Sequence, residues 1–395
     1  MRTAETPLIK LDTPRFGYQP ALDGVRGLGV FIVMFYHFGG DLWLHGAPIM
    51  VDIFFVLSAF LITNLLLDEM HREQAISLRG FYTRRILRLF PAMYALLGFV
   101  SVVAIIATLA GSDALQGIWV EILAIGTYMY NMLLAFGGFE GSTGDTRYLL
   151  HLWTLSMEEW FYVCWPLALI WGLKRTRNQR PLLLAACGFV VFWMVVRLTA
   201  HEQIANVAGN QLGGDSGIPY ARQVVLRLSV MRPDSLVIGC LSAIASRALF
   251  PLTARTRRLV TMGGVLSACV LAAELVLAGR VAGFEPFGSP GYNLAIVMLG
   301  PGVVWMHYSP DALVCKELSR SFWVFAGKRS YGIYIWHPMP NAVLGEFGPG
   351  RIAMLARMAV LMVISFGIAE LSWRFIESPF LRRKHALFGA TKSGR

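Results

Sequence analysis

The chain has 395 residues, of which 56% are hydrophobic and only 15% are charged. Soluble globular proteins carry about 25% charged residues, and apolar runs near the ~20 residues needed to cross a bilayer recur along this whole chain. These features exclude a soluble protein and predict an all-α, polytopic membrane helical bundle. The net charge of +11 lies between apolar runs, as in loops on the cytoplasmic side, so we expect no nucleic-acid partner.

Eleven apolar segments follow one another along the chain and are the candidate membrane helices. They lie at 22–40, 49–67, 89–110, 116–136, 152–173, 181–199, 228–249, 259–280, 291–308, 322–345 and 352–373. All the basic loops fit on the cytoplasmic side only if either 116–136 or 152–173 fails to span. We therefore predict about ten crossings, one re-entrant or broken segment, and both termini in the cytoplasm.

The chain shows no change of composition that marks a second membrane domain. We expect a cytoplasmic N-terminal segment at 1–20, one transmembrane domain at 21–378 and a basic cytoplasmic tail at 379–395. The first segment lacks the short apolar core and cleavage site of a secretory signal peptide. The five cysteines are odd in number and widely spaced, so we expect neither a disulfide framework nor a metal site.

The first apolar segment carries three ionisable side chains, Asp23, Arg26 and His37. Each such group costs roughly 2.5–3.5 kcal/mol at the centre of a bilayer on insertion scales, so three of them require a reason. Arg26 and His37 are eleven residues apart and share one helix face, about 16 Å apart along the axis. They are either structural, with Arg26 paired to Asp23, or they line a reaction cavity.

Two further segments place carboxylates in apolar surroundings. Asp52 heads the segment 49–67 and is either a helix-start residue or a cavity group. Glu158 and Glu159 are adjacent within HLWTLSMEEWFYVCWPL, and His151 lies two helical turns before Glu158. The alternative for this pair is a glutamate that reaches the membrane interface within an aromatic belt.

A cationic cluster precedes the segment 89–110. Arg84, Arg85 and Arg88 stand close together in FYTRRILRLFPAMY, and arginine forks suit bidentate phosphate binding. We therefore expect a phosphorylated ligand on the cytoplasmic side. The later motifs RPDSLVIG, SYGIYIWHPM and WRFIESPF look more structural, although His337 is a candidate to face the cavity and Pro338 is expected to break its helix.

Taken in order, these motifs resemble the acyltransferase-3 family of integral membrane O-acyltransferases, from about residue 20 to 380. Seven sequence features account for the resemblance: the Arg26–His37 spacing, DIFFVLSAF, RRILRLFPA, HLWTLSMEEWFY, RPDSLVIG, SYGIYIWHP and ESPF. Ala59, Thr154 and Trp160 stand where the family usually has glycine, serine and glutamine. Trp160 removes a polar side chain beside Glu159, which puts the acceptor pocket in doubt.

The resemblance implies transfer of a short acyl group, most often acetyl, from acyl-CoA to a hydroxyl in a bacterial cytoplasmic membrane. His37 would be the general base, Glu158 or Asp52 would orient its imidazole, and Arg26 would bind the donor or the oxyanion. The phosphates of CoA, a substrate and not a resident cofactor, would be held by Arg84, Arg85, Arg88, Lys174 and Arg175. We rank direct transfer above an acyl-enzyme on Ser58 or Ser156.

The acceptor expected first is a glycolipid or an envelope glycan, and a macrolide-like natural product is the alternative. A different class of protein, a proton-coupled carrier or flippase, also suits ten crossings and an intramembrane Arg–His pair. Carriers usually contain an internal repeat, and none is visible in this sequence. The cluster of Arg84, Arg85 and Arg88 also favours binding of a phosphorylated donor over a pathway for protons.

Overall fold

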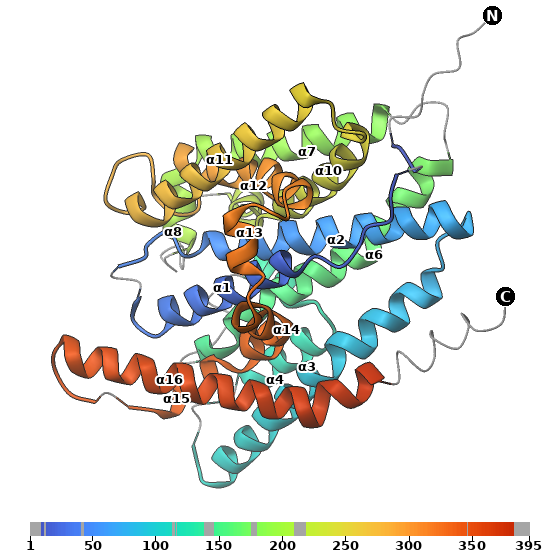
Figure 1. Ribbon diagram of the computed structural model, residues 1–395. Coiled ribbons are helices and arrows are strands. Elements are labelled where there is room, and N and C mark those ends of the chain that lie inside the picture. The colour runs from blue at the N-terminus through green and yellow to red at the C-terminus, as the bar shows by residue number, and fades with distance from the viewer. Residues whose placement is uncertain are drawn as a thin grey trace, which may run out of the picture. The chain divides into compact units, whose positions relative to one another are not determined.

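The computed structural model describes residues 9–382, apart from residues 12, 41–42, 113–114, 116, 138–145, 175–179, 209–218 and 346. Every regular element in this part of the chain is a helix (Figure 1), which confirms the all-α class. Five helices are long and apolar enough to span a membrane: Ile49–Glu73, Leu78–Leu109, Arg180–Thr199, Ala254–Leu277 and Arg351–Arg382. The count of about ten crossings stays a prediction.

The chain forms two compact units, each assembled from segments that are far apart in sequence. Unit 1 comprises Met1–Val25, Leu42–Ile76 and Met157–Val324, and unit 2 comprises Arg26–Asp41, Ser77–Ser156 and Phe325–Arg395. Three helices pass from one unit into the other. They are α1 (Pro20–His37), α6 (Trp153–Lys174) and α14 (Ser321–Trp336).

Unit 1 is a bundle held together by close helix contacts at small residues. Its own helices are α2 (Ile49–Glu73), α7 (Arg180–Thr199), α8 (His201–Ala208), α9 (Tyr220–Val230), α10 (Pro233–Leu249), α11 (Ala254–Leu277), α12 (Pro290–Tyr308) and α13 (Leu313–Leu318). A Cβ on Gly239 of α10 would stand 2.4 Å from the carbonyl oxygen of Val56 in α2. A Cβ on Gly264 of α11 would clash in the same way with Trp305 of α12. Membrane helices approach closely only where such small residues face each other.

Unit 2 contains the predicted segment 116–136, and its described residues form two short helices instead of one long one. Its helices are α3 (Leu78–Leu109), α4 (Ile118–Gly126), α5 (Tyr130–Gly137), the 3-10 helix η3 (Thr146–Leu152), α15 (Pro338–Val343), α16 (Arg351–Ser372) and the π-helical turn η4 (Trp373–Glu377). Between α4 and α5, Tyr128 adopts a left-handed conformation with φ 56°. Helices of nine and eight residues reach only about 12–14 Å, whereas the 22 residues of α6 reach about 33 Å. The hydrocarbon core is ~30 Å thick, so neither α4 nor α5 is long enough to cross it. The helix α6 has the length but is not among the five candidates that are also apolar enough, so which of the two predicted segments fails to span stays a prediction.

The described part of the predicted N-terminal segment is fastened to unit 1. Lys10 Nζ donates to the carbonyl oxygens of Ala248 and Phe250, each at 3.0 Å. The backbone N–H of Phe16 donates to the Asp68 carboxylate at 2.9 Å. Lys10 and Phe16 therefore lie against the ends of α10 and α2. Of the predicted tail, only 379–382 lie within the described residues.

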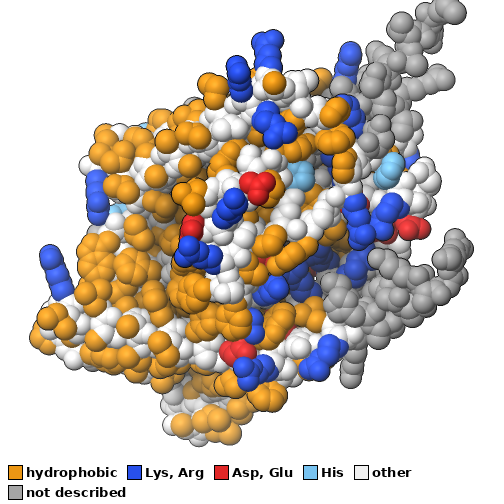
Figure 2. All heavy atoms as spheres, viewed as in Figure 1, with side chains coloured by type: hydrophobic (Ala, Val, Ile, Leu, Met, Phe, Trp, Pro, Cys, Tyr) orange, Lys and Arg blue, Asp and Glu red, His pale blue; other side chains and the backbone are white. Residues whose placement is uncertain are grey.

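The outer face of α16 is apolar, as expected for contact with lipid. Figure 2 shows hydrophobic side chains gathered along this helix. Val363 is 72% exposed and Ile352 is 85% exposed. Soluble monomers rarely expose a continuous apolar surface of this kind, so the surface of α16 supports a membrane environment.

Candidate active site

Arg26 and His37 both lie on α1, in the part of it that belongs to unit 2. Arg26 is half-buried, and His37 is the last residue of the helix with an exposed side chain. Eleven residues correspond to about three turns and about 16 Å of rise, so the two side chains share a face. The predicted helical relation between them is confirmed.

The imidazole of His37 contacts a second histidine, His337, which lies 300 residues later in the chain. Nδ1 of His37 is 2.8 Å from Nε2 of His337, a hydrogen-bond distance. The two rings are nearly parallel, with an interplanar angle of 10° and centroids 5.0 Å apart. His337 is fully buried, whereas His37 retains an exposed face. The exposed imidazole is thus positioned by a buried one.

The backbone determines the orientation of His337. In an α-helix the carbonyl of Tyr334 would accept from the N–H of residue 338, but residue 338 is proline and has no N–H. Nδ1 of His337 takes that place and donates to the Tyr334 carbonyl oxygen at 2.8 Å. The proline that ends α14 therefore supplies the acceptor that fixes the ring.

These two hydrogen bonds assign the tautomer of both neutral rings. Because Nδ1 of His337 must donate to a carbonyl, its Nε2 carries the lone pair and accepts from Nδ1–H of His37. The remaining nitrogen of His37, Nε2, then holds a lone pair and is able to take a proton. An imidazole oriented by a partner on its other nitrogen is the arrangement of a general base.

A third histidine and a tyrosine complete the surroundings of His337 in unit 2. The His151 ring, in η3, stands 5.2 Å from the ring of His337 between centroids. The Tyr334 hydroxyl donates to the backbone carbonyl of His151 at 2.9 Å and lies 2.8 Å from the Thr154 hydroxyl. Among the described residues, no three His, Cys, Asp or Glu side chains are placed to hold a metal ion.

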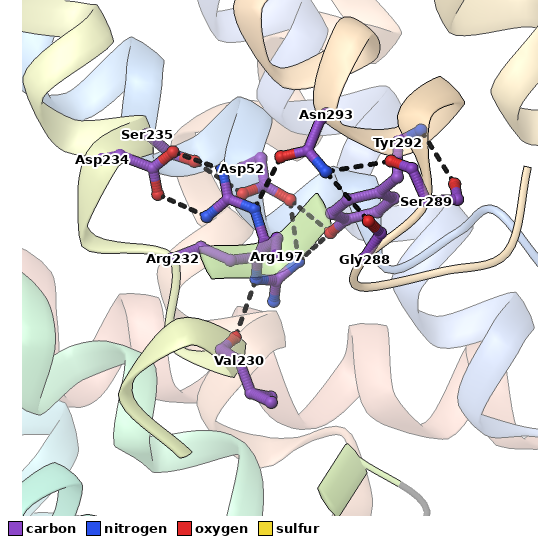
Figure 3. Close-up of polar contacts among 10 residues, drawn as sticks. All are labelled: Asp52, Arg197, Val230, Arg232, Asp234, Ser235, Gly288, Ser289, Tyr292 and Asn293. Atoms are coloured by element: carbon purple, nitrogen blue, oxygen red, sulfur yellow. Dashed lines mark hydrogen bonds and ion pairs between the residues drawn. The ribbon is translucent and has the colours of Figure 1, made fainter. Parts of the chain in front are cut away.

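Asp52 is fully buried in unit 1, where three partners occupy its carboxylate. It accepts from Arg232 at 2.7 Å, from the Ser235 hydroxyl at 2.6 Å and from the Tyr292 hydroxyl at 2.7 Å (Figure 3). Asp52 thereby neutralises the buried charge of Arg232. The expected role of Asp52 or Glu158 in orienting the His37 imidazole stays a prediction.

The same region of unit 1 holds a second buried ion pair. Arg197 of α7 binds both carboxylate oxygens of Asp234, at 2.8 and 2.5 Å, and donates from Nε to Asn293 at 2.8 Å (Figure 3). Arg232 precedes Pro233 in a left-handed conformation with φ 50°, which orients it toward α2. The motif RPDSLVIG thus supplies one partner of each buried ion pair, Arg232 and Asp234, and its expected structural role stays a prediction.

Glu158 and Glu159 lie half-buried on α6, in the part of that helix that belongs to unit 1. The hydroxyl of Ser58, one of the alternative nucleophiles, lies 2.8 Å from the hydroxyl of Tyr162 on α6. This contact pairs the two hydroxyls within unit 1. The ranking of direct transfer above an acyl-enzyme on Ser58 stays a prediction.

The arginine cluster occupies the first turns of α3 in unit 2. Arg84, Arg85 and Arg88 are half-buried, and the Arg85 guanidinium lies 5.6 Å from the centre of the Phe81 ring. Arg88 acts electrostatically on Glu377 of η4, which is buried in the same unit. The helix α3 has 32 residues and is about 48 Å long, which exceeds a ~30 Å hydrocarbon core.

Lys174 and Arg175 are two further predicted phosphate ligands. Lys174 is exposed at the last residue of α6, which belongs to unit 1. Arg175 lies outside the described residues. Their role in donor binding stays a prediction.

Comparisons with known proteins agree with the motif order. The acyltransferase domain family matches residues 19–374. Peptidoglycan O-acetyltransferase OatA of Listeria monocytogenes is 30% identical over 374 residues, 92% of this chain and 56% of that protein. The putative peptidoglycan O-acetyltransferase YrhL of Bacillus subtilis is 29% identical over 378 residues, 93% of this chain and 55% of that protein.

O-acetyltransferase OatA of Staphylococcus aureus is 27% identical over 387 residues, 96% of this chain and 60% of that protein. The chain thus spans somewhat more than half the length of these relatives. No solved structure matches it. With its motifs in order along nearly the whole chain and the family match over residues 19–374, this protein is a member of the acyltransferase-3 family.

Proposed function

We propose that the protein is a membrane-embedded O-acyltransferase that moves a short acyl group, acetyl first, from acyl-CoA to a hydroxyl of a cell-envelope glycan. The observation that carries this proposal is the His37–His337 pair, which orients an accessible imidazole nitrogen in a chain of an acyltransferase family. The two relatives named as peptidoglycan O-acetyltransferases favour peptidoglycan or its precursors as the glycan.

In this mechanism the acceptor hydroxyl attacks the carbonyl carbon of the thioester while Nε2 of His37 takes its proton. The tetrahedral intermediate collapses with cleavage of the carbon–sulfur bond, and the imidazolium returns the proton to the CoA thiolate. The products are the ester and free CoA. General-base assistance of this kind contributes roughly 10²–10⁴-fold in rate. His337 holds Nδ1–H of His37 throughout and so keeps Nε2 on the reacting side.

The cations of unit 2 suit the donor. Arg84 and Arg88 are one helical turn apart on α3, and guanidinium forks bind phosphates bidentately. We assign the phosphates of CoA to this cluster, at the predicted cytoplasmic end. Arg26, about three turns before His37 on α1, is assigned to the thioester oxyanion or to the donor.

The test is acetyl transfer by the purified protein, using radiolabelled acetyl-CoA and lipid-linked or soluble peptidoglycan fragments. His37→Gln is expected to lower transfer by roughly 10²–10⁴-fold, because it removes the base. The matched control is His71→Gln, an exposed histidine at the end of α2, which is expected to keep wild-type transfer. A wild-type protein that neither binds acetyl-CoA nor releases CoA would overturn the proposal and favour the carrier alternative.

A further inference from the structure

Unit 1 contains an apolar groove that acyl transfer does not use. It is lined by residues of α7, α10, α11 and α12 and has a volume of about 510 Å³. Small residues form much of its wall, among them Ala245 of α10, Gly263 of α11 and Gly300 of α12. The volume lies within the ~300–1,000 Å³ of sites that hold small-molecule ligands.

The lining of the groove offers almost no polar contact to an occupant. Its two hydroxyls have partners inside the protein: Ser242 donates to the Ile238 carbonyl at 2.7 Å, and Thr256 lies 2.9 Å from the Thr253 hydroxyl. Two of the helices that form it, α7 and α11, are membrane-span candidates with largely exposed surfaces. A groove with this lining, in a bundle of membrane-span candidates, is complementary to a hydrocarbon chain.

One end of the groove is strongly basic. It reaches Leu249, the last residue of α10, and Thr256 in the first turn of α11. Arg255 and Arg257 are exposed there, each within one helical turn of a groove residue, and Lys10 binds the Phe250 carbonyl beside them. Figure 2 shows basic side chains projecting where α11 begins, at its yellow end in Figure 1.

No acidic residue offsets this charge along the neighbouring chain. The sequence contains no Asp or Glu between Asp234 and Glu274, a stretch that includes nearly all of α10 and most of α11. Guanidinium groups at the end of a hydrocarbon-lined groove match a phosphodiester joined to an acyl chain. The cationic end is thus complementary to the phosphodiester of such a molecule, and the apolar groove is complementary to its acyl chain.

We propose that this groove binds one anionic phospholipid, with an acyl chain against Ala245 and Gly263 and the headgroup phosphate at Arg255 and Arg257. The lipid comes from the leaflet that meets the start of α11. Every residue of this proposed site lies in unit 1, whereas His37 and His337 lie in unit 2.

Native mass spectrometry of the detergent-purified protein tests the proposal, with phosphatidylglycerol and phosphatidylcholine of identical acyl chains as probes. The wild type is expected to retain phosphatidylglycerol in preference to phosphatidylcholine. Ala245→Trp fills the groove and is expected to weaken retention of both lipids by about tenfold or more. Ala248→Trp, on the same helix but outside the groove, is expected to bind like the wild type.

The headgroup assignment has its own variant, which leaves the packed interior unchanged. Arg255→Gln/Arg257→Gln is expected to remove the preference for phosphatidylglycerol while retention of phosphatidylcholine stays as in the wild type. Arg351→Gln/Arg382→Gln removes the same charge from exposed positions of unit 2 and is expected to keep the preference. Equal lipid retention by wild type and Ala245→Trp, or an unchanged preference in Arg255→Gln/Arg257→Gln, would refute the site.

Discussion

His37 and His337 illustrate how a single hydrogen bond assigns chemistry to a side chain. An isolated neutral imidazole exchanges its proton between two nitrogens, and only one of the two tautomers leaves Nε2 free to act as a base. The Tyr334 carbonyl removes that ambiguity for His337, and His337 removes it for His37. We therefore regard His337 as a positioning residue.

Replacing His337 separates positioning from mere packing. His337→Gln places an amide oxygen where Nε2 stood and is expected to retain much of kcat, because Nδ1–H of His37 keeps an acceptor. His337→Leu leaves that N–H without an acceptor and is expected to lower kcat by about 10²–10⁴-fold, as wrong-tautomer variants do elsewhere. Steady-state transfer kinetics, with kcat and KM determined across pH, distinguish the two. Equal losses in both variants would contradict the positioning role.

The arginine cluster of α3 leads to a prediction about donor binding. Arg84→Gln/Arg88→Gln is expected to weaken acetyl-CoA binding in calorimetry by about tenfold or more, because charge-assisted phosphate contacts are lost. The contribution that is lost is expected to shrink as salt rises, since half-buried cations are partly screened. Arg255→Gln/Arg257→Gln removes equal charge from α11 and serves as the control. If both double variants changed acetyl-CoA binding equally, the α3 arginines would not be the phosphate site and would only reflect the positive charge of cytoplasmic loops.

At the level of the helices, Pro338 both ends a helix and determines the orientation of a side chain in the site. Pro338 ends α14 after Trp336 and at the same time leaves the Tyr334 carbonyl without a backbone donor. The His337 side chain supplies the missing donor to that carbonyl. The α14 break and the orientation of the buried histidine thus have one cause.

Restoring the backbone donor is expected to disturb this arrangement. In Pro338→Ala the new N–H competes with Nδ1 of His337 for the Tyr334 carbonyl, so we expect kcat to fall by about tenfold or more, as for lost supporting contacts elsewhere. Pro340→Ala is the matched control, because its N–H is directed at the Trp336 carbonyl and not at Tyr334. Transfer rates of both variants decide the matter, and a Pro338→Ala protein as active as Pro340→Ala would count against it.

Helix breaks were only partly visible in the sequence. Pro338 predicted the end of α14. The distribution of basic loops predicted that either 116–136 or 152–173 is interrupted. Neither signal distinguished between those two segments. The left-handed turn is at Tyr128, whereas glycine or asparagine are the residues that predict such a turn from sequence. Pro166, by contrast, lies inside a continuous α6.

For the chain as a whole, buried ion pairs join helices that are distant in sequence. Asp52 of α2, Arg232 before α10 and Tyr292 of α12 meet in unit 1, and Arg197 of α7 joins them through Asp234 and Asn293. Removing one partner of a buried pair leaves an uncompensated charge, which costs about 3–5 kcal/mol. The network therefore specifies which helices pack together.

This network predicts a large difference between two Asp→Asn variants. Asp52→Asn is expected to destabilise the protein by about 3–5 kcal/mol and to lower its thermal unfolding midpoint in detergent, because Arg232 loses its counter-charge. Asp311→Asn alters a 96% exposed carboxylate 4.0 Å from Lys316 and is expected to change stability by no more than about 0.5 kcal/mol. Similar midpoints for the two variants would show that Asp52 is not a structural charge.

The amino-acid sequence by itself determined the helical membrane class, the approximate positions of the long apolar helices and the choice of His37, Arg26 and the arginine cluster as candidates. Those features depend on local hydropathy, helical periodicity and the type of each side chain. Tertiary structure paired His37 with His337, paired Asp52 with Arg232, and divided 116–136 into two short helices at Tyr128. The first two are contacts between residues 180 or more positions apart, and the third is a backbone turn without a glycine to mark it. Local patterns contain no information on such pairings, because the partner of a polar side chain is set by how the helices pack.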